Sequence, residues 1–585
     1  MTPLDIRAFK INLPWESYRR HASLQLHETA CRDLDFWRAL IDHLAWAGFN
    51  RLSLWSLHPW ALMVRPAKYP EACDLTDEEL AEWQAFWHAL FGHVHERGLK
   101  VQIFTWNIFV SPAFARARNV AAYSIGGDYL GDGDLSDLVE DYTREIVTEA
   151  LQTFPEIDGL GLTLSERMGG LDNPERGEWV KRTYGAAASA AGRPLEINLR
   201  VPHSGSGHCN APLTDETLSV GRRLLEESGF DGPLLSEVKF NWSHGHSSPR
   251  LLKIHNGAPN DALWNPPPSR YRITWMVRNE DFQALRWCAP GFIREHLRLN
   301  THPWVAGYYT GSETWIPALN LVDRDDHPHR AAWQFQRQRL FTAVWGHLLR
   351  DPDATDEDLG RMVEEAYDLP EHQSGAGLQL LRALECAGTI PLRIASFLNF
   401  TWDHTLYVEG MLTLDGFITV EQVQKARPLE PDWLGVADAV AAERSGTHPP
   451  GRLHPEDLAK ELEDLASETE QRLRASLVMS LEGPVVEERE DARVWAALGR
   501  YFAEKLRAAL ALEREGKDSH QAQHHLRNGL THWQRVVELT ESRYQPFPVQ
   551  HLDKTEKVLW HWKDWMPLVS AECGVRKADP TTSNK

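Results

Sequence analysis

A carboxylate at the end of an apolar run is the first candidate for chemistry in this sequence. The run reads Gly-Leu-Gly-Leu-Thr-Leu-Ser over residues 159–165, and Glu166 and Arg167 follow it. Small and apolar residues in such a run are typical of a strand that is buried on both faces. In a parallel α/β barrel the active site lies at the carboxyl ends of the strands. We therefore expect Glu166 to be a catalytic acid; the alternative is a carboxylate that only pairs with Arg167 or caps the next loop.

The elements that would position Glu166 follow from the alternation of strand and helix patterns in the first part of the chain. A helical pattern over residues 33–48, for example, carries Trp37, Leu40 and Leu44 at three-and-four spacing. Such alternation predicts a parallel sheet, and eight strands predict an α/β fold of the closed (β/α)8 TIM-barrel type. Besides the run that begins at residue 159, the predicted strands are residues 9–13, 51–55, 100–105, 195–199, 234–240, 271–277 and 304–309.

Two further carboxylates lie at predicted strand ends and could act with Glu166. Glu237 lies within the run 234–240, and Glu313 follows the last run in a Gly-Ser-Glu-Thr-Trp turn. Glycoside hydrolysis needs one protonated carboxyl group for the leaving oxygen and one ionised group that activates water or attacks the sugar. Glu237, which Lys239 would keep ionised, and Glu313 are equal candidates for the second group. The alternative for each is a structural ion pair in the barrel mouth.

Basic, polar and aromatic side chains at the same strand ends are candidates for substrate binding. Guanidinium groups bind carboxylates bidentately, and flat aromatic faces pack against the apolar faces of sugar rings. We expect an anionic sugar, such as a uronic acid, beside Glu166, held by Arg200 and Arg278; the alternatives are cations that only balance the catalytic carboxylates and tryptophans that only fill the core. The candidate substrate-binding residues are Arg167, Arg200, His203, Lys239, Asn241, Trp242, Arg278, Trp106 and Trp315.

Composition and charge exclude several classes of function. The 585 residues are 42% hydrophobic and 25% charged, as in an ordinary globular protein. The formal net charge of −21 argues against nucleic-acid binding, because phosphate contacts need clustered Lys and Arg. No apolar run is long enough to span a bilayer, and residues 1–20 lack the apolar core of a signal peptide. The six cysteines form no Cys-x-x-Cys pair, so we expect reduced thiols in a cytoplasmic protein without nucleic-acid or membrane partners.

A few histidines have the spacing of metal ligands. His244 and His246 form an alternate pair, and His203 and His208 lie on a neighbouring predicted loop. However, no His-x-His pair follows the first predicted strand, where a metal-dependent hydrolase barrel would have one. We therefore expect no catalytic metal and no cofactor, and interpret these histidines as hydrogen-bond partners of sugar hydroxyls or loop backbone.

The character of the sequence changes near residue 351. Strand patterns nearly vanish, which predicts a catalytic barrel over residues 1–350 and a mostly α-helical C-terminal domain over residues 351–585. A loop at residues 399–411, rich in polar and aromatic groups including Glu409, is a candidate to reach back over the barrel mouth. The long amphipathic patterns of the second part cover residues 356–367, 378–390, 454–477, 491–512 and 519–539.

Several motifs lie between residues 159 and 315. They are Glu166, the stretch Trp-Met-Val-Arg-Asn-Glu-Asp from Trp275, the Leu-Arg-Trp from Leu285 and the Ala-Gly-Tyr-Tyr-Thr-Gly-Ser from Ala306. In these motifs the sequence resembles the barrel glycoside hydrolases related to the α-glucuronidases of glycoside hydrolase family 67. The resemblance implies a glycosidase for a uronic acid or a related sugar, a helical C-terminal domain, and a general-acid role for Glu166. The residue that matches the family's base stays open among the strand-end carboxylates Glu237, Asp281 and Glu313.

Together these features favour a glycoside hydrolase that uses paired carboxylates and acts from a chain end on an oligosaccharide containing uronic acid or another anionic sugar. Two other functions remain open. A non-catalytic carbohydrate-binding barrel would keep the tryptophans but would need no acid–base pair. A metal-dependent lyase or hydrolase of acidic sugars would need bound metal. The sequence does not decide the oligomeric state.

Overall fold

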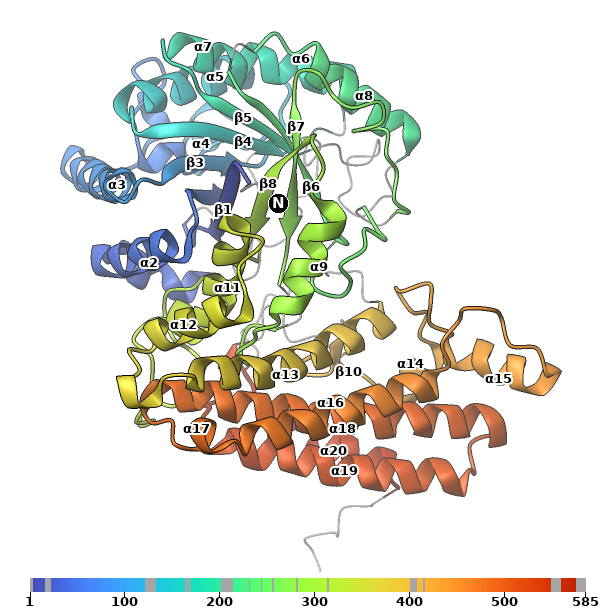
Figure 1. The fold of residues 1–585 in the computed structure, drawn as a ribbon. Helices are drawn as coiled ribbons and strands as arrows, with labels where there is room; N and C mark the ends of the chain where they lie inside the picture. Colours follow the sequence, from blue (N-terminus) through green and yellow to red (C-terminus); the bar gives the residue numbers. More distant parts are fainter. Residues whose placement is uncertain are drawn as a thin grey trace, which may run out of the picture.

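A closed barrel of parallel strands and a layer of long helices make up the computed structural model (Figure 1). This arrangement confirms the predicted fold class, a (β/α)8 barrel followed by a helical C-terminal region. The structure describes residues 4–15, 23–120, 133–163, 168, 170–200, 214–230, 232–242, 245–254, 257–279, 282–312, 315–399, 408–413, 416–548 and 559–574.

The eight barrel strands pair in chain order, and β8 pairs with β1 to close the sheet. Each predicted strand is present, with bounds that differ from the prediction by a few residues. Because all strands are parallel, their carboxyl ends open on one face of the barrel. The strands are β1 (Ile6–Asn12), β2 (Arg51–Ser56), β3 (Lys100–Thr105), β4 (Ile157–Thr163), β5 (Glu196–Arg200), β6 (Leu234–Lys239), β7 (Arg272–Val277) and β8 (Val305–Thr310).

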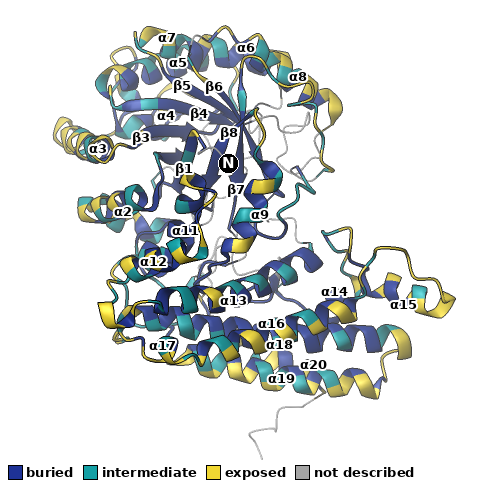
Figure 2. Cartoon of the chain, viewed as in Figure 1, coloured by how far each residue is buried: buried dark blue, intermediate teal, exposed yellow. Residues whose placement is uncertain are grey.

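Helices surround the barrel, and their buried faces point toward the sheet while exposed residues face outward (Figure 2). Local signals set some of their ends: Thr76 and Glu79 form a capping box at the start of α3 (Asp77–Glu96), and Gly48 ends α2 (Leu34–Ala47) at φ 107°. The helices are α1 (Glu28–Arg32), α2 (Leu34–Ala47), α3 (Asp77–Glu96), α4 (Pro112–Arg118), α5 (Asp137–Thr153), α6 (Asn173–Val180), α7 (Ala186–Ala190), α8 (Asp215–Glu226), α9 (Pro290–Asn300), α10 (Gln334–Arg337) and α11 (Arg339–Arg350), with the short turns η1 (Ser23–His27), η2 (Pro59–Leu62), η3 (Pro70–Ala72) and η4 (Lys181–Gly185).

One predicted helix differs from the structure. Apolar residues at helical spacing over residues 329–349, among them Leu340, Val344 and Leu348, predict a single helix. The structure has the short α10 and then α11 instead. The two are separated at Gln338, whose backbone leaves the helical region at φ −96° and ψ 28°. The side chain of Gln338 binds the carbonyl groups of Gln283 and Leu285 instead, so a tertiary contact overrides the local pattern.

Long helices dominate the chain after α11, as the amphipathic patterns predicted. In Figure 1 α13, α16, α18 and α19 run side by side, and α18 contacts the other three. The elements are α12 (Asp356–Ala366), α13 (Ala376–Leu398), α14 (Val420–Lys425), α15 (Val436–Ser445), α16 (Pro455–Leu473), α17 (Ser476–Met479), α18 (Val486–Glu515), α19 (His520–Glu541) and α20 (Met566–Glu572), with the turns η5 (Glu371–Gln373), η6 (Gly483–Val485) and η7 (Trp562–Trp565) and the short strands β9 (Leu412–Thr413), β10 (Gly416–Phe417), β11 (Phe547–Pro548) and β12 (Leu559–Trp560).

A polar network fills the amino-terminal half of the barrel interior. Arg51 and Glu196 form a buried ion pair across it. Gln102 accepts hydrogen bonds from the hydroxyl groups of Ser53, at 3.0 Å, and Tyr309, at 2.9 Å. These contacts pair polar side chains in the amino-terminal half of the barrel, whereas barrels of this type bind their ligands at the opposite, carboxyl end.

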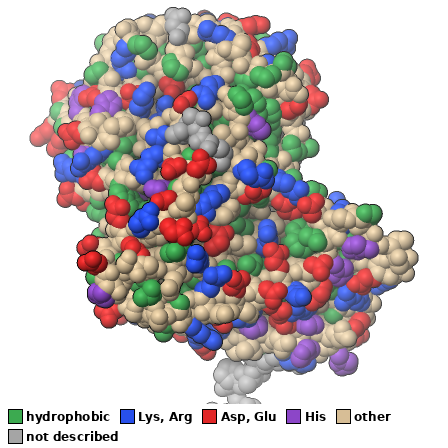
Figure 3. All heavy atoms as spheres, in the orientation of Figure 1, with side chains coloured by type: hydrophobic (Ala, Val, Ile, Leu, Met, Phe, Trp, Pro, Cys, Tyr) green, Lys and Arg blue, Asp and Glu red, His purple; other side chains and the backbone are tan. Residues whose placement is uncertain are grey.

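The surface shows acidic and basic side chains interspersed over the face in view (Figure 3). This mixture agrees with the composition and gives no single-sign field on that face. Among the helices that the structure describes, none combines the length and apolar character needed to cross a membrane.

Candidate active site

Charged side chains gather inside the barrel near the carboxyl ends of its strands. Lys10 from β1, Arg200 from β5, Glu237 and Lys239 from β6, and Arg278 directly after β7 are all buried, with at most 7% of each residue exposed. The residues next to them in the sequence lie in the apolar core around the barrel; these neighbours are Phe9, Leu199, Val238 and Val277. Since successive side chains of a strand point to opposite faces, the charged residues face the barrel interior.

Arg200 and Glu237 form an ion pair at this end. They are register partners on the adjacent strands β5 and β6, and the Nε of Arg200 lies 3.4 Å from the Oε1 of Glu237. Neither residue is more than 1% exposed. A buried charge is strongly destabilising without a partner, so the two residues depend on each other. The structure thus brings one candidate catalytic carboxylate together with one candidate substrate-binding cation.

Trp55 from β2 holds two cations at the same level of the barrel. The ring of Phe104 stacks on it, with centroids 3.5 Å apart and planes 5° apart. The Nζ of Lys10 lies 4.2 Å from the centroid of the Trp55 ring, and the guanidinium of Arg200 lies 5.0 Å from it. Because Phe104 covers one face of the indole, the other face is left to the cations. A ligand that reaches Trp55 therefore contacts the cations Lys10 and Arg200 rather than an open face of the indole ring.

Gly161 in β4 makes the stack of Phe104 and Trp55 possible. A Cβ at Gly161 would lie 1.9 Å from the Cδ2 of Phe104, so any larger residue pushes the phenyl ring off Trp55. We expect Gly161→Ala to destabilise the protein by about 1–3 kcal/mol, the usual cost of overpacking a core, measured by urea unfolding.

Gly92→Ala is the matched control for Gly161→Ala, because a Cβ there, within α3, meets nothing within 4 Å. That replacement adds a methyl group to a helix and should stabilise it slightly. Equal unfolding free energies for the Gly161→Ala variant and the native protein would contradict the described packing.

Asn241 and Trp242 shape the loop after β6. The amide group of Asn241 donates to the carbonyls of Ser248 and Arg250, at 3.3 and 2.9 Å, and its oxygen accepts from the backbone N–H groups of Leu252 and Lys253. All four hydrogen-bonding positions of the amide are therefore used. The side chain of Asn241 therefore holds the loop, and its role in substrate binding stays a prediction.

Trp242, also predicted to bind substrate, is 2% exposed, and its ring centroid lies 5.3 Å from the Nζ of Lys239. The ring therefore holds a cation of the barrel mouth and presents little surface of its own. The role of Lys239 in substrate binding stays a prediction.

The histidine pair proposed as an alternative metal site can be examined at His246. Its Nδ1 hydrogen-bonds to the carbonyl of Arg278 at 2.8 Å, and its Nε2 accepts the indole N–H of Trp345 at 3.0 Å. Both ring nitrogens are engaged, so His246 has no lone pair for a metal ion. Among the described residues there is no group of three His, Cys, Asp or Glu side chains that could hold a metal ion.

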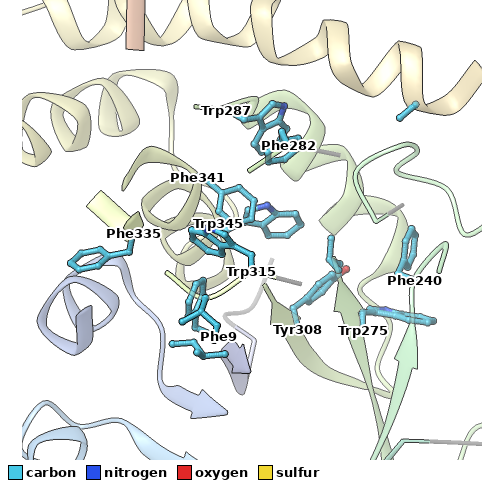
Figure 4. Close-up of a cluster of buried hydrophobic side chains, with 14 of the residues drawn as sticks. Phe9, Phe240, Trp275, Phe282, Trp287, Tyr308, Trp315, Phe335, Phe341 and Trp345 are labelled. Atoms are coloured by element: carbon cyan, nitrogen blue, oxygen red, sulfur yellow. The ribbon is translucent and has the colours of Figure 1, made fainter. Parts of the chain in front are cut away.

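Two tryptophans predicted to bind sugar lie in apolar cores. Trp315 is 5% exposed and belongs to the core cluster that also contains Phe9 and Trp345, as Figure 4 shows. Trp106 is 3% exposed and packs edge-on against Trp55, with ring centroids 5.3 Å apart. Trp315 therefore packs in the core, and its contact with sugar stays a prediction. Trp106 lies within the barrel interior, where it supports Trp55 from the side.

Four predicted site residues, Glu166, Arg167, His203 and Glu313, lie outside the described residues, and their roles stay predictions. The described chain nevertheless fixes the strands that lead to two of them. β4 ends at Thr163, which precedes Glu166 by three positions, and Ser312 directly precedes Glu313. In the sequence, both carboxylates therefore come just after the carboxyl end of a barrel strand, as expected.

Lys10 lies among the charged residues inside the barrel, although the sequence analysis did not name it as a candidate. The residues of β1 alternate between those that join the outer core, such as Phe9 and Ile11, and those that face the barrel interior, such as Ala8 and Lys10. This period of two was visible in the sequence and would have placed Lys10 on the interior face. A lysine inside a barrel needs charged or polar partners, which is a signal of function.

No family model and no curated protein matches the sequence. Among solved structures, the chain is similar to a GH138 enzyme targeting pectin rhamnogalacturonan II, with a TM-score of 0.77, 17% identity, and coverage of 98% of this chain and 67% of that chain. A GH115 4-O-methyl-α-glucuronidase with specificity for decorated arabinogalactans gives a TM-score of 0.42 at 9% identity, covering 100% of this chain and 64% of the other. An O-GlcNAc hydrolase mutant of Thermobaculum terrenum gives a TM-score of 0.40 at 10% identity, covering 97% of this chain and 94% of that chain. The structural neighbours are thus glycoside hydrolases, and the chain shares its fold with the first of them.

Proposed function

We propose that the protein is a glycoside hydrolase that releases a uronic acid, or another anionic sugar, from the end of an oligosaccharide. The observation that carries the proposal is the pair of cations, Lys10 and Arg200, that lies over Trp55 beside the carboxylate Glu237. This group stands at the carboxyl end of the barrel, where such folds bind their substrates. The shared fold with a GH138 enzyme that targets pectin rhamnogalacturonan II supports the reaction class.

Charge recognition explains why the substrate is anionic. The described side chains at this end of the barrel include the cations Lys10, Arg200, Lys239 and Arg278 and the carboxylate Glu237, while the carboxylates Glu166 and Glu313 follow strand ends outside the described residues. A sugar carboxylate can accept charge-assisted hydrogen bonds from an ammonium and a guanidinium group at once. A neutral hydroxymethyl group in its place would leave these buried cations with a weaker partner, which costs binding energy.

The chemistry requires a proton donor and an ionised carboxylate on the two sides of the glycosidic bond. Glu166 is the proposed donor. Glu237 and Glu313 are the proposed candidates for the second group, and the pairing of Glu237 with Arg200 suits a carboxylate that accepts protons or attacks carbon rather than one that donates. A separation of about 5 Å between the two carboxyl groups would give retention, and about 6.5–9.5 Å would give inversion.

A hydrolysis screen tests the proposal. Oligosaccharides ending in a uronic acid are incubated with the native protein beside matched oligosaccharides that end in the corresponding neutral sugar, and the released monosaccharides are separated by anion-exchange chromatography. We expect release of the uronic acid from at least one member of the panel. Preferential release of the neutral sugar would contradict the assigned substrate class. Binding of uronides without release of any sugar would instead support a carbohydrate-binding protein.

A further inference from the structure

The segment at residues 283–287, which follows β7, is held by the C-terminal helical region; we call it the docking segment. Four consecutive backbone N–H groups in it donate to two carboxylates. Those of Gln283, Ala284 and Leu285 donate to Glu409 at 2.8, 3.0 and 2.7 Å, and that of Arg286 donates to Asp491 at 2.9 Å. Successive N–H groups aimed at one carboxylate form an anion-binding nest, and here the nest is filled from within the chain.

The carbonyl groups of the docking segment are also bound by side chains. Gln338 donates to the carbonyls of Gln283 and Leu285 at 3.0 and 2.9 Å. The indole N–H of Trp495 donates to the carbonyl of Arg286 at 2.9 Å. The segment is neither helix nor strand, so these side chains, rather than local structure, set its conformation.

Glu409 is itself fixed in place. It is fully buried, and the indole N–H groups of Trp562 and Trp565 donate to the carbonyls of Glu409 and Gly410 at 2.6 and 2.8 Å. Burial raises the pKa of Glu409 to about 7, and the backbone donors of the docking segment and the charge of Arg337 oppose that rise. Both side-chain oxygens accept backbone N–H groups, the arrangement of an ionised carboxylate.

The docking segment is also linked to the end of β8. The side-chain amide of Gln283 donates to the hydroxyl of Ser312 at 2.8 Å. Ser312 is the residue before Glu313, and the segment itself begins two residues after Asp281. The chain of contacts from Glu409 through Gln283 to Ser312 therefore joins the C-terminal region to two strand ends that carry candidate catalytic carboxylates.

We propose that Glu409 is a positioning residue of the active site, which holds the ends of β7 and β8 in their catalytic arrangement through the docking segment. The proposal rests on the proposed function, because it assumes that the strand-end carboxylates perform the reaction. It assigns the C-terminal helical region a structural part in the active site, through the position of two strand ends. That region supplies the anion around which the loop after β7 folds.

Glu409→Gln tests the proposal with little change of volume. The replacement turns one side-chain oxygen into an NH2 group that faces backbone donors, so at least one hydrogen bond of the nest is lost. A displacement of about 1 Å in a catalytic group costs up to about 100-fold in rate. We expect kcat for the best uronide to fall by about 10- to 100-fold while KM changes much less, because the cations that bind the sugar are untouched.

Glu385→Gln is the matched control. Glu385 also lies on the C-terminal region, in α13, and it accepts a backbone N–H of the barrel, that of Gly291 at 2.7 Å. The charged groups near it are Arg294 and Asp356, and its described contacts do not involve the docking segment or Ser312. We expect Glu385→Gln to lower the melting temperature but to leave kcat unchanged. An equal loss of kcat in both variants would overturn the proposal, because both effects would then come from weaker docking of the helical region.

Ser312→Ala tests the route of the effect. If Glu409 acts through Gln283 and Ser312, the double variant Glu409→Gln, Ser312→Ala should lose no more activity than the more affected single variant. If the activity losses of the two single variants multiply in the double variant, Glu409 and Ser312 act independently, and the proposed route is overturned.

Amide hydrogen exchange provides a readout that does not need activity. In Glu409→Gln we expect faster exchange at residues 283–285 and also at residues 308–312, whereas Glu385→Gln should change neither. Faster exchange at 283–285 alone would contradict the coupling to β8. If no glycoside is hydrolysed, the proposed function fails, but the exchange data still decide whether Glu409 positions the two strand ends.

Discussion

Replacing Glu166 by glutamine is expected to lower turnover of an anionic glycoside by about two to four orders of magnitude, the usual worth of general acid catalysis. Glutamine keeps the size of the side chain but cannot donate a carboxyl proton to the leaving oxygen. The fold and the affinity for the sugar should therefore persist. Single-turnover kinetics measure the chemical step, and calorimetry with the same glycoside measures the affinity.

Glu156→Gln is a suitable control for Glu166→Gln, because Glu156 directly precedes β4 at the opposite end of the same strand and binds His88 at 2.9 Å. Turnover in this variant should equal that of the native protein. Native turnover in Glu166→Gln would remove Glu166 from the mechanism. A loss of sugar affinity equal to the loss of rate would assign it to binding instead.

The second large effect is expected for Lys10→Met. The replacement removes the ammonium group over Trp55 but leaves Arg200 in place to neutralise Glu237. Hydrogen bonds to charged groups contribute about 1.5–3 kcal/mol, so kcat/KM for the uronide should fall by about 10- to 100-fold. The matched neutral glycoside, which lacks the carboxylate, should lose much less. Arg200→Ala is a poorer test, because it leaves the buried charge of Glu237 without this partner.

Lys100→Met provides the comparison for Lys10→Met. Lys100 is the exposed first residue of β3, at the amino-terminal end of the barrel, so its removal changes the net charge equally but leaves the proposed site intact. We expect its kcat/KM for the uronide to match that of the native protein. If Lys10→Met slowed the uronide and the neutral glycoside to the same extent, Lys10 would support the barrel and would not recognise the sugar carboxylate.

The sequence predicted the architecture well because its signals were local. The barrel strands are short segments buried on almost all of both faces. The spacing of Thr76 and Glu79 is likewise a local signal, and it forms a capping box at the start of α3. The five long amphipathic patterns correspond to α12, α13, α16, α18 and α19. In contrast, the helix predicted over residues 329–349 is interrupted at Gln338, whose contacts come from a distant loop.

The candidate site was predicted only in part, since position at a strand end does not reveal what a side chain contacts. Arg200 and Glu237 meet because their strands are neighbours in register, and this follows from the barrel order. Asn241 and Trp315 also follow strands, but a loop and an apolar core engage their side chains. These contacts join segments that are distant in the sequence, so no local pattern predicts them.

The Leu-Arg-Trp motif from Leu285 shows the same limit. It contributed to the family 67 resemblance, yet in the structure it belongs to the docking segment and binds the helical region through Asp491 and Gly388. The loop expected to reach the barrel, at residues 399–411, does so at Glu409. Its target is the backbone after β7, so its effect on the site is indirect.

We propose that the carboxyl end of this barrel binds an anionic sugar through Lys10 and Arg200. A crystal structure of Glu166→Gln with an uncleaved uronide oligosaccharide tests it most directly. In this complex we expect the sugar carboxylate within hydrogen-bonding distance of the Nζ of Lys10 and the guanidinium of Arg200, with the glycosidic oxygen facing residue 166. A uronide bound with its carboxylate turned to solvent, or bound away from this end of the barrel, would contradict it.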